Sequence, residues 1–186
     1  MALAAKHRRF TVDDYHRMAQ AGIFGENDRV ELIDGEIVEM TPIGSRHAAC
    51  VKKLNKLLSE RVRERAIVSV QDPVRLSGDS ELQPDVALLR PRADFYASEP
   101  PGPPDVLLVV EVADTSLLYD RDFKAARYAR GGIPEVWVVD LEGEQVHVFR
   151  DLKAGTYGVH ETRSRGGSLR IPLSGVAELG VDDVIP

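Results

Sequence analysis

The fold class is decided by the stretch Val106-Leu107-Leu108-Val109-Val110-Glu111-Val112-Ala113. Apolar residues occupy both alternating positions of this run, which is typical of a central strand covered on both faces. We therefore expect helices on each side of a sheet. One carboxylate, Glu111, interrupts the run, and burying it there would be costly without a cation or hydrogen-bond donors. The stretch thus predicts a central strand and an unusual buried acid.

A second carboxylate begins another apolar run, Gln83-Pro84-Asp85-Val86-Ala87-Leu88-Leu89. Pro84 cannot donate a ladder hydrogen bond, so it favours the start of a strand at Asp85. Two acids on adjacent strands can hold one divalent cation, because Mg²⁺ takes oxygen ligands and keeps several waters. The alternative is that Asp85 is an ordinary strand-end acid that faces solvent.

Lys124 follows in a segment that reads as a helix over 120–130 and that stops at Gly131-Gly132. Lys124 and Tyr128 are four residues apart and share one helix face. If this helix packs beside the strand of Glu111, Lys124 would reach the acids and Tyr128 would steady it. An ammonium there stabilises charge that develops on a phosphate, or orients the attacking water. The alternative is a surface lysine.

Two further residues are candidates for the same site. Glu31 lies in a predicted hairpin strand and by alternation shares a face with Ile33, so it points towards an apolar side or a cleft. The alternative for Glu31 is an ordinary cross-strand partner. His47 lies near the start of a predicted helix, where a histidine can act as a base or as a water-mediated metal ligand. Its alternative is a buried core histidine.

The other elements follow from local patterns. Thr11 is expected to cap a short helix that ends near Gly22 or Gly25. Asp34-Gly35 between two alternating apolar runs predicts a hairpin over 29–40. A helix after Ser45 is expected to bury one stripe, and the proline-rich segment 91–105 reads as a loop. Strands are predicted at 67–70, 74–76, 85–90, 106–112, 134–140 and 145–150, with a final strand at 157–162. We expect a single α/β domain over 1–186 with a central mixed sheet.

Composition limits the function classes. The chain has 186 residues, of which 43% are hydrophobic and 29% charged, so it can form a packed core. No apolar run approaches the roughly 18 residues that span a membrane, and Met1 to Phe10 shows no secretory signal. One cysteine fits a reducing cytoplasm. The phosphate-loop and dinucleotide motifs are absent from the sequence, and so are paired zinc ligands.

The formal net charge of -6 argues weakly against a protein whose whole surface binds nucleic acid. The charge is uneven, however, because basic residues dominate the segment 46–65. That segment is either a phosphate-facing helix or a solvated helix face.

Several segments together resemble the PD-(D/E)XK nuclease superfamily, and more closely the Uma family of restriction-endonuclease-like proteins. The resemblance covers about residues 10–150 and rests on the ordered set rather than on one piece. Its segments are Phe10-Thr11-Val12-Asp13-Asp14-Tyr15, Val30 to Ile37, His47, Gln83-Pro84-Asp85-Val86, Val109 to Ala113, Lys124 to Tyr128 and Gly132 to Asp140.

This resemblance implies a restriction-endonuclease-like core with flanking helices, an N-terminal helix and a β-hairpin. Pro84-Asp85 would be the PD motif and Glu111 the second acid, but Ala113 stands where the superfamily has lysine. The Uma-like pattern moves that lysine to Lys124. By resemblance Mg²⁺ or Mn²⁺ would be held by Asp85, Glu111 and the carbonyl of Val112, with Glu31 and His47 completing the site.

The main hypothesis is therefore a metal-dependent DNA endonuclease, with a homodimer as a further expectation because cutting both strands needs two sites. One alternative is a catalytically inactive nucleic-acid-binding or interaction module on the same fold. Another is a metal-dependent hydrolase of a different phosphoester.

Overall fold

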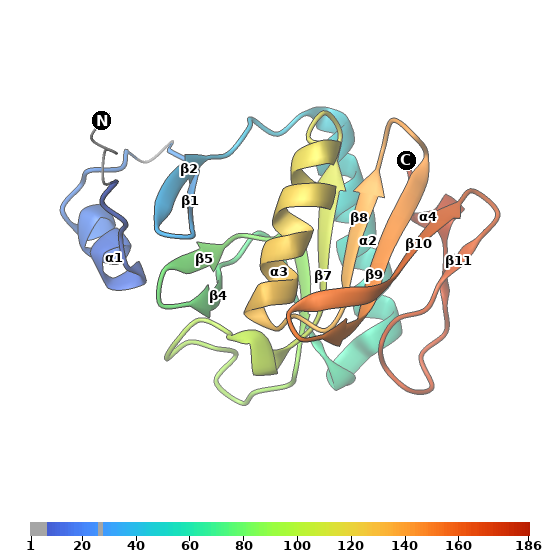
Figure 1. Ribbon diagram of the computed structural model, residues 1–186. Coiled ribbons are helices and arrows are strands. Elements are labelled where there is room, and N and C mark those ends of the chain that lie inside the picture. The colour runs from blue at the N-terminus through green and yellow to red at the C-terminus, as the bar shows by residue number, and fades with distance from the viewer. Residues whose placement is uncertain (1–6, 26–27) are drawn as a thin grey trace.

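The structure is a computed structural model that describes residues 7–25 and 28–186. The first six residues, part of the region 1–10 in which we expect no secretory signal, lie outside the described residues. Three sheets, of six, four and two strands in the part of the chain that the structure describes, and the helices around them make up the fold (Figure 1). The helices are α1 (Val12–Gln20), α2 (Ser45–Val62), α3 (Ala125–Gly131) and α4 (Val181–Val184).

The larger sheet has six strands in the order β10-β9-β8-β7-β6-β3. Only β7 and β8 run parallel, with Glu111 beside Val138, while the other neighbours are antiparallel, so the sheet is mixed. Its strands are β3 (Ile67–Ser69), β6 (Val86–Leu89), β7 (Val106–Ala113), β8 (Val136–Asp140), β9 (Gln145–Lys153) and β10 (Thr156–Ser164). The predicted central strand is β7, between β6 and β8.

The smaller sheet has four strands in the order β2-β1-β5-β4 and lies beside the larger one (Figure 1). The predicted hairpin joins β1 and β2, with Asp34 and Gly35 both at positive φ, as a tight turn requires. Its strands are β1 (Val30–Ile33), β2 (Glu36–Glu39), β4 (Val74–Ser77) and β5 (Ser80–Leu82). Strand β1 therefore carries Glu31 towards the larger sheet.

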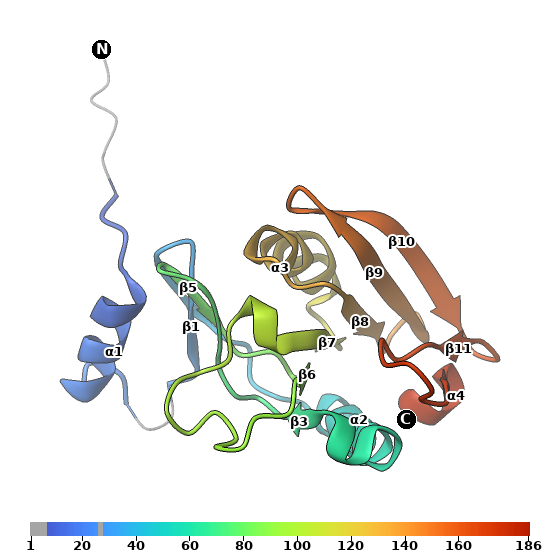
Figure 2. The ribbon, with the colours of Figure 1, turned by 90° about the horizontal axis from the view of Figure 1, so that it is seen from below.

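Helices α2 and α3 cover opposite faces of the larger sheet (Figure 2). The predicted stripe of α2 is confirmed, since Val51, Leu54, Leu58 and Val62 are buried. They pack with Leu108, Val110 and Val112 of β7. On the other face Tyr128 of α3 packs with alternate β7 and β8 residues. Burial on both sides explains why the central run reads as continuously apolar.

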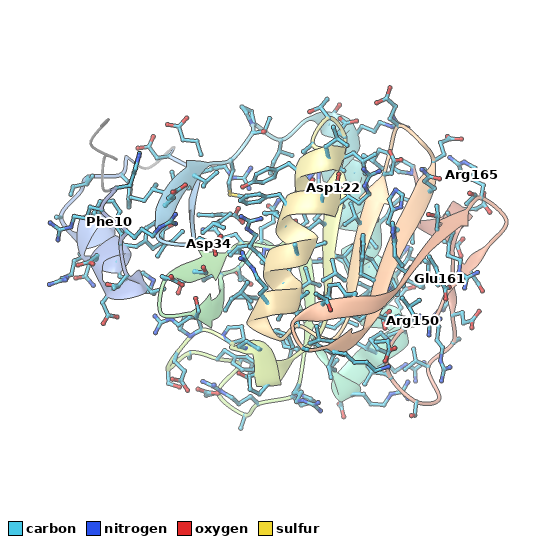
Figure 3. All side chains as sticks on the ribbon, viewed as in Figure 1. Phe10, Asp34, Asp122, Arg150, Glu161 and Arg165 are labelled. Atoms are coloured by element: carbon cyan, nitrogen blue, oxygen red, sulfur yellow. The ribbon has the colours of Figure 1, made fainter. Side chains whose placement is uncertain are left out.

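The turn of the β1–β2 hairpin is tied to α3. Asp34 forms ion pairs with Arg127 and Arg130, at 3.2 and 3.0 Å. Figure 3 shows Asp34 between the smaller sheet and α3. A separate ion pair lies at the β10 edge of the larger sheet, where Arg150 of β9 and Glu161 of β10 are side by side (Figure 3). The ion pairs of Asp34 link the β1–β2 hairpin to α3.

Several sequence expectations need correction. The predicted strand at 157–162 is not the last, because a two-stranded sheet of β11 (Ser168–Leu169) and β12 (Leu179–Gly180) follows. Strand β5 was not predicted, since its three residues are too short to show a pattern. The predicted helix over 120–130 is two elements, a π-helical turn over Tyr119–Lys124 and then α3. Strand β6 begins at Val86, so Asp85 directly precedes it.

The caps predicted for α1 and α3 are confirmed, but the prediction that Ser45 caps the next helix is wrong, because α2 begins at Ser45 with Gly44 as its N-cap. Thr11 caps α1 through a reciprocal pair of hydrogen bonds with Asp14, and α1 ends at Gln20. Gly132 follows α3 in the left-handed conformation, at φ 94°. The basic side chains of the 46–65 segment are partly used inside the fold, because Arg46, Lys53 and Arg65 donate to backbone carbonyls.

Candidate active site

A pocket of about 290 Å³ opens where the two sheets meet. Five separate parts of the chain line it: the hairpin, the start of α2, the residue before β6, the end of β7 with its following loop, and the π-helical turn. All six residues predicted for the site line this one pocket: Glu31, His47, Asp85, Glu111, Val112 and Lys124. The fold thus gathers residues spread over nearly a hundred positions.

Asp85 is held by three donors. Its Oδ2 accepts from the backbone N–H of Val112 at 2.9 Å and lies 2.9 Å from Nε2 of His47. Its Oδ1 accepts from Nε2 of Gln71 at 3.1 Å. Asp85 is 7% exposed, so the alternative of a solvent-facing acid is wrong. His47 points at this carboxylate rather than into the core, and its Nδ1 has no hydrogen-bond partner among the described residues.

Glu111 lies at the centre of a second group of contacts. Its Oε1 accepts from Nζ of Lys124 at 3.0 Å and from the hydroxyl of Tyr128 at 2.6 Å. Its Oε2 lies 3.4 Å from the backbone N of Asp85, which connects the two acids. Lys124 and Tyr128 thus reach one oxygen from successive positions on one helical face. Lys124 is 4% exposed, so the alternative of a surface lysine is wrong.

Glu31 closes the cluster from the smaller sheet. Its Oε1 accepts from Nζ of Lys124 at 3.0 Å and from the backbone N–H of Gln83 at 2.7 Å. Glu31 is buried, and Lys124 bridges it to Glu111. A buried ammonium between two carboxylates is well compensated, because each charge has an opposite partner within hydrogen-bond distance.

Sequence reasoning missed two residues of this site. Asp120 is buried, lines the pocket and accepts a hydrogen bond from the hydroxyl of Ser116. Its position four residues before Lys124 was a usable signal, since residues four apart share a helix face. Gln71 gave no such signal, because its contact with Asp85 depends on a strand register that the sequence does not reveal.

Burial, neighbouring charges and hydrogen bonds shift the pKa values of the site's acids in different directions. Burial raises the pKa of Glu111 to about 8, while Lys124 opposes this rise and Asp85 adds to it. Burial also raises the pKa of Asp120 to about 6, opposed by the hydroxyl of Ser116 and by Lys124. For Asp85 burial acts upward too, but the bonds from His47, Val112 and Gln71 hold its pKa below the ordinary value.

The pKa values of His47 and Lys124 are both raised. The hydrogen bond to Asp85 raises the pKa of His47. Burial acts to lower the pKa of Lys124, but Glu111 and Glu31 outweigh it and raise that pKa. The pocket therefore favours the cationic forms of His47 and Lys124 and the anionic form of Asp85, whereas it disfavours the anionic forms of Glu111 and Asp120.

The backbone at the end of β7 fits the predicted cation ligands. Val109 donates to Glu135, and Ala113 accepts from Leu141, so odd-numbered residues of β7 direct their peptide groups towards β8 and the segments flanking it. Val112 therefore directs its N–H and its carbonyl to the other side, where its N–H meets Asp85. The donor set is two carboxylates and one carbonyl, all oxygen, as Mg²⁺ and Mn²⁺ prefer.

The predicted metal ligands include only two side chains, and the third is a backbone carbonyl. Within residues 7–25 and 28–186, no group of three or more His, Cys, Asp or Glu side chains is arranged to hold a metal ion. Within the same described ranges, no helix is both long and apolar enough to cross a membrane.

The fold is shared with a solved structure, described as a putative nuclease belonging to DUF820 from Anabaena variabilis ATCC 29413. The two have a TM-score of 0.74 at 16% sequence identity, over 94% of this chain and 97% of that one. The two chains therefore share one mixed α/β fold. The model of the family Uma2, "Putative restriction endonuclease", matches residues 12–181, and the chain belongs to this family. None of the curated proteins matches the chain.

Proposed function

We propose that this protein is a metal-dependent endonuclease that hydrolyses phosphodiester bonds of DNA, with Mg²⁺ or Mn²⁺ as its cofactor. One observation carries the proposal. Asp85 and the β7 residues Glu111 and Val112 converge at the edge of one pocket, with the buried Lys124 bonded to one of the two acids. Membership of a family described as restriction endonucleases supports it.

Asp85, Glu111 and the carbonyl of Val112 would hold the metal ion. When bound, the ion would activate a water molecule and neutralise charge on the phosphate. His47 and Val112 fix Oδ2 of Asp85, and Gln71 fixes its Oδ1, so the carboxylate is oriented before any ligand arrives. Because the carboxylate is already oriented, it does not have to reorganise during the reaction.

Lys124 would stabilise negative charge on the phosphate, or orient the attacking water. Its ammonium is already held between Glu31 and Glu111, and Tyr128 fixes the same oxygen of Glu111. Glu31 therefore acts on the site through Lys124. His47, with Nε2 on Asp85, would present Nδ1 to accept a proton or to bind a water molecule.

The proposed substrate is DNA, and the proposed cutting unit is a homodimer, because cutting both strands of a duplex needs two sites. The net charge of -6 favours a second candidate, an inactive nucleic-acid-binding or interaction module on the same fold. The two candidates differ in one result, since the module would bind without cleaving.

Plasmid and linear DNA incubated with the protein, with and without Mg²⁺ or Mn²⁺, test the proposal. We expect cleavage that needs the metal and that is lost in Asp85→Ala and in Glu111→Ala. Metal-dependent cleavage that survives both substitutions would contradict the proposed site. Binding of DNA with no cleavage under any of these conditions would favour the second candidate.

A further inference from the structure

Gln71 lies directly opposite Asp85 at the edge of the larger sheet. The β3–β6 ladder pairs Ile67 with Leu89 and Ser69 with Ala87, and continuing this register by two residues pairs Gln71 with Asp85. The backbone N of Gln71 donates to the carbonyl of Asp85 at 3.2 Å. The side-chain amide donates to Oδ1 of the same residue at 3.1 Å. One residue therefore holds both the backbone and the carboxylate of Asp85.

The backbone of Gln71 is in a conformation that side chains rarely adopt. Its φ is 58°, in the left-handed region that glycine occupies most easily. This conformation turns the chain out of the ladder before β4. A glycine would make the same turn without strain, but it would lose the amide that contacts Asp85. Strained residues of this kind are concentrated at functional sites, where the surrounding structure holds them in place.

The contact leaves Asp85 with one defined acceptor position. Oδ2 already meets the N–H of Val112 and Nε2 of His47, which occupy its two lone pairs. Gln71 occupies one lone pair of Oδ1 and leaves the other. Because an amide carries no net charge, it orients the carboxylate without competing with a cation for the site.

We propose that Gln71 is a positioning residue that orients Oδ1 of Asp85 towards the bound metal ion. This inference rests on the proposed metal-dependent function. Hydrogen bonds that orient metal ligands typically change metal affinity by about 10- to 100-fold when they are removed. A loss of that size that is absent from a matched variant outside the pocket distinguishes positioning from a structural role.

Mn²⁺ binding to the full chain, measured by calorimetry and by electron paramagnetic resonance, tests the proposal without any need for cleavage. We expect Gln71→Gly to weaken Mn²⁺ binding about tenfold or more. Relief of the strained φ offsets part of the stability lost with the hydrogen bond to Asp85, so the unfolding midpoint should fall only modestly. Gln71→Met, which keeps the length of the side chain and removes the amide, should also weaken Mn²⁺ binding about tenfold or more.

Two matched variants serve as controls. Gln145 also donates its amide to a buried aspartate, Asp140, at 2.9 Å, but outside the pocket. Ala154 also has a positive φ, at 48°, in the β9–β10 turn. Neither Gln145→Met nor Ala154→Gly should change Mn²⁺ affinity. Affinity in Gln71→Gly equal to that of the wild type would overturn the role of Gln71. So would an equal loss of Mn²⁺ affinity in Gln145→Met, because a general loss of stability would then account for the effect. A wild-type protein that binds no Mn²⁺ would instead overturn the proposed function, and this inference with it.

Discussion

Two clusters of titratable residues invite comparison: the pocket cluster (Glu31, His47, Asp85, Glu111 and Lys124) and the hairpin cluster (Asp140, His147 and His160). Both contain histidine beside aspartate, at 2.9 Å between His47 and Asp85 and at 4.0 Å between His147 and Asp140. They differ in where their partners come from. The pocket cluster draws them from separate segments of the chain, whereas the hairpin cluster draws them from neighbouring strands and their turn.

The carboxylates of the two clusters also have different partners. Asp140 caps its own turn, accepting from the N–H of Gly143 at 2.8 Å and from Gln145 at 2.9 Å. Its oxygens stabilise local structure. Asp85 and Glu111 are held by distant residues and line an open pocket. The difference teaches that a buried acid is a candidate for chemistry when distant segments fix its orientation while its oxygens still face a cavity.

The largest contrast is expected in cleavage. Asp85→Ala removes a proposed metal ligand, so we expect metal-dependent DNA cleavage to fall about a thousandfold, the equivalent of several kcal/mol of transition-state stabilisation. Asp140→Asn should leave cleavage unchanged, although its turn is weakened. Initial rates of plasmid nicking measure both. Equal losses in the two variants would show that the two clusters do not differ in function.

The next contrast concerns stability. Lys124→Met leaves Glu31 and Glu111 buried without their shared cation, so the free energy of unfolding should fall by about 3–5 kcal/mol. Lys153→Met removes a lysine from an exposed pair with Asp151. Exposed pairs contribute little, so this variant should unfold like the wild type. Urea denaturation compares them, and a wild-type midpoint for Lys124→Met would contradict the buried bridge.

A smaller contrast uses two tyrosines. The hydroxyl of Tyr128 donates to the carboxylate of Glu111 at 2.6 Å, whereas that of Tyr157 donates to the neutral carbonyl of Ile133 at 2.8 Å. Tyr128→Phe should therefore cost about 1.5–3 kcal/mol of stability and Tyr157→Phe about 1 kcal/mol. Thermal unfolding of the metal-free protein gives the order, and a reversed order would show that Glu111 does not need this donor.

The smallest effect is a pH dependence in the hairpin cluster. Burial lowers the pKa of His147, and the charges of His160 and Arg121 lower it further, although Asp140 and Asp122 oppose this. The unfolded chain then binds a proton more readily. Stability is therefore full above pH 6.5 and falls as the pH drops through the folded-state pKa, by at most about 1.4 kcal/mol per pH unit.

His147→Gln removes this titrating group. Between about pH 7.5 and pH 5, on either side of the ordinary histidine pKa, its unfolding free energy should therefore fall less than that of the wild type. Identical slopes for both proteins would contradict the assignment. The sign is opposite for His47, since its bond to Asp85 raises its pKa.

The sequence predicted the elements that have a strong local pattern. The continuous apolar run predicted β7 and its two covered faces, and Asp34-Gly35 predicted the hairpin turn. It did not predict β5, which has three residues and pairs with β1 and β4 by tertiary contact. The π-helical turn was also missed, since the extra residue in its turn leaves no mark in the apolar periodicity.

The candidate site was predicted in the same uneven way. Asp85 and Glu111 stood out because each acid adjoins an apolar run. Lys124 depended on how one helix docks, and the structure places it between Glu31 and Glu111. Gln71 could not be found, because its contact requires the β3–β6 register. Local chemistry therefore marks the acids, whereas the residues that orient them follow only from the three-dimensional arrangement.

The most direct test of the central claim is a crystal structure of the protein soaked with Mn²⁺, recorded with anomalous diffraction. We predict one anomalous peak in the pocket, within about 2.0–2.3 Å of a carboxylate oxygen of Asp85, a carboxylate oxygen of Glu111 and the carbonyl oxygen of Val112, as hard cations bind oxygen. A pocket without a peak at saturating Mn²⁺, or a peak that contacts neither acid, would contradict the claim.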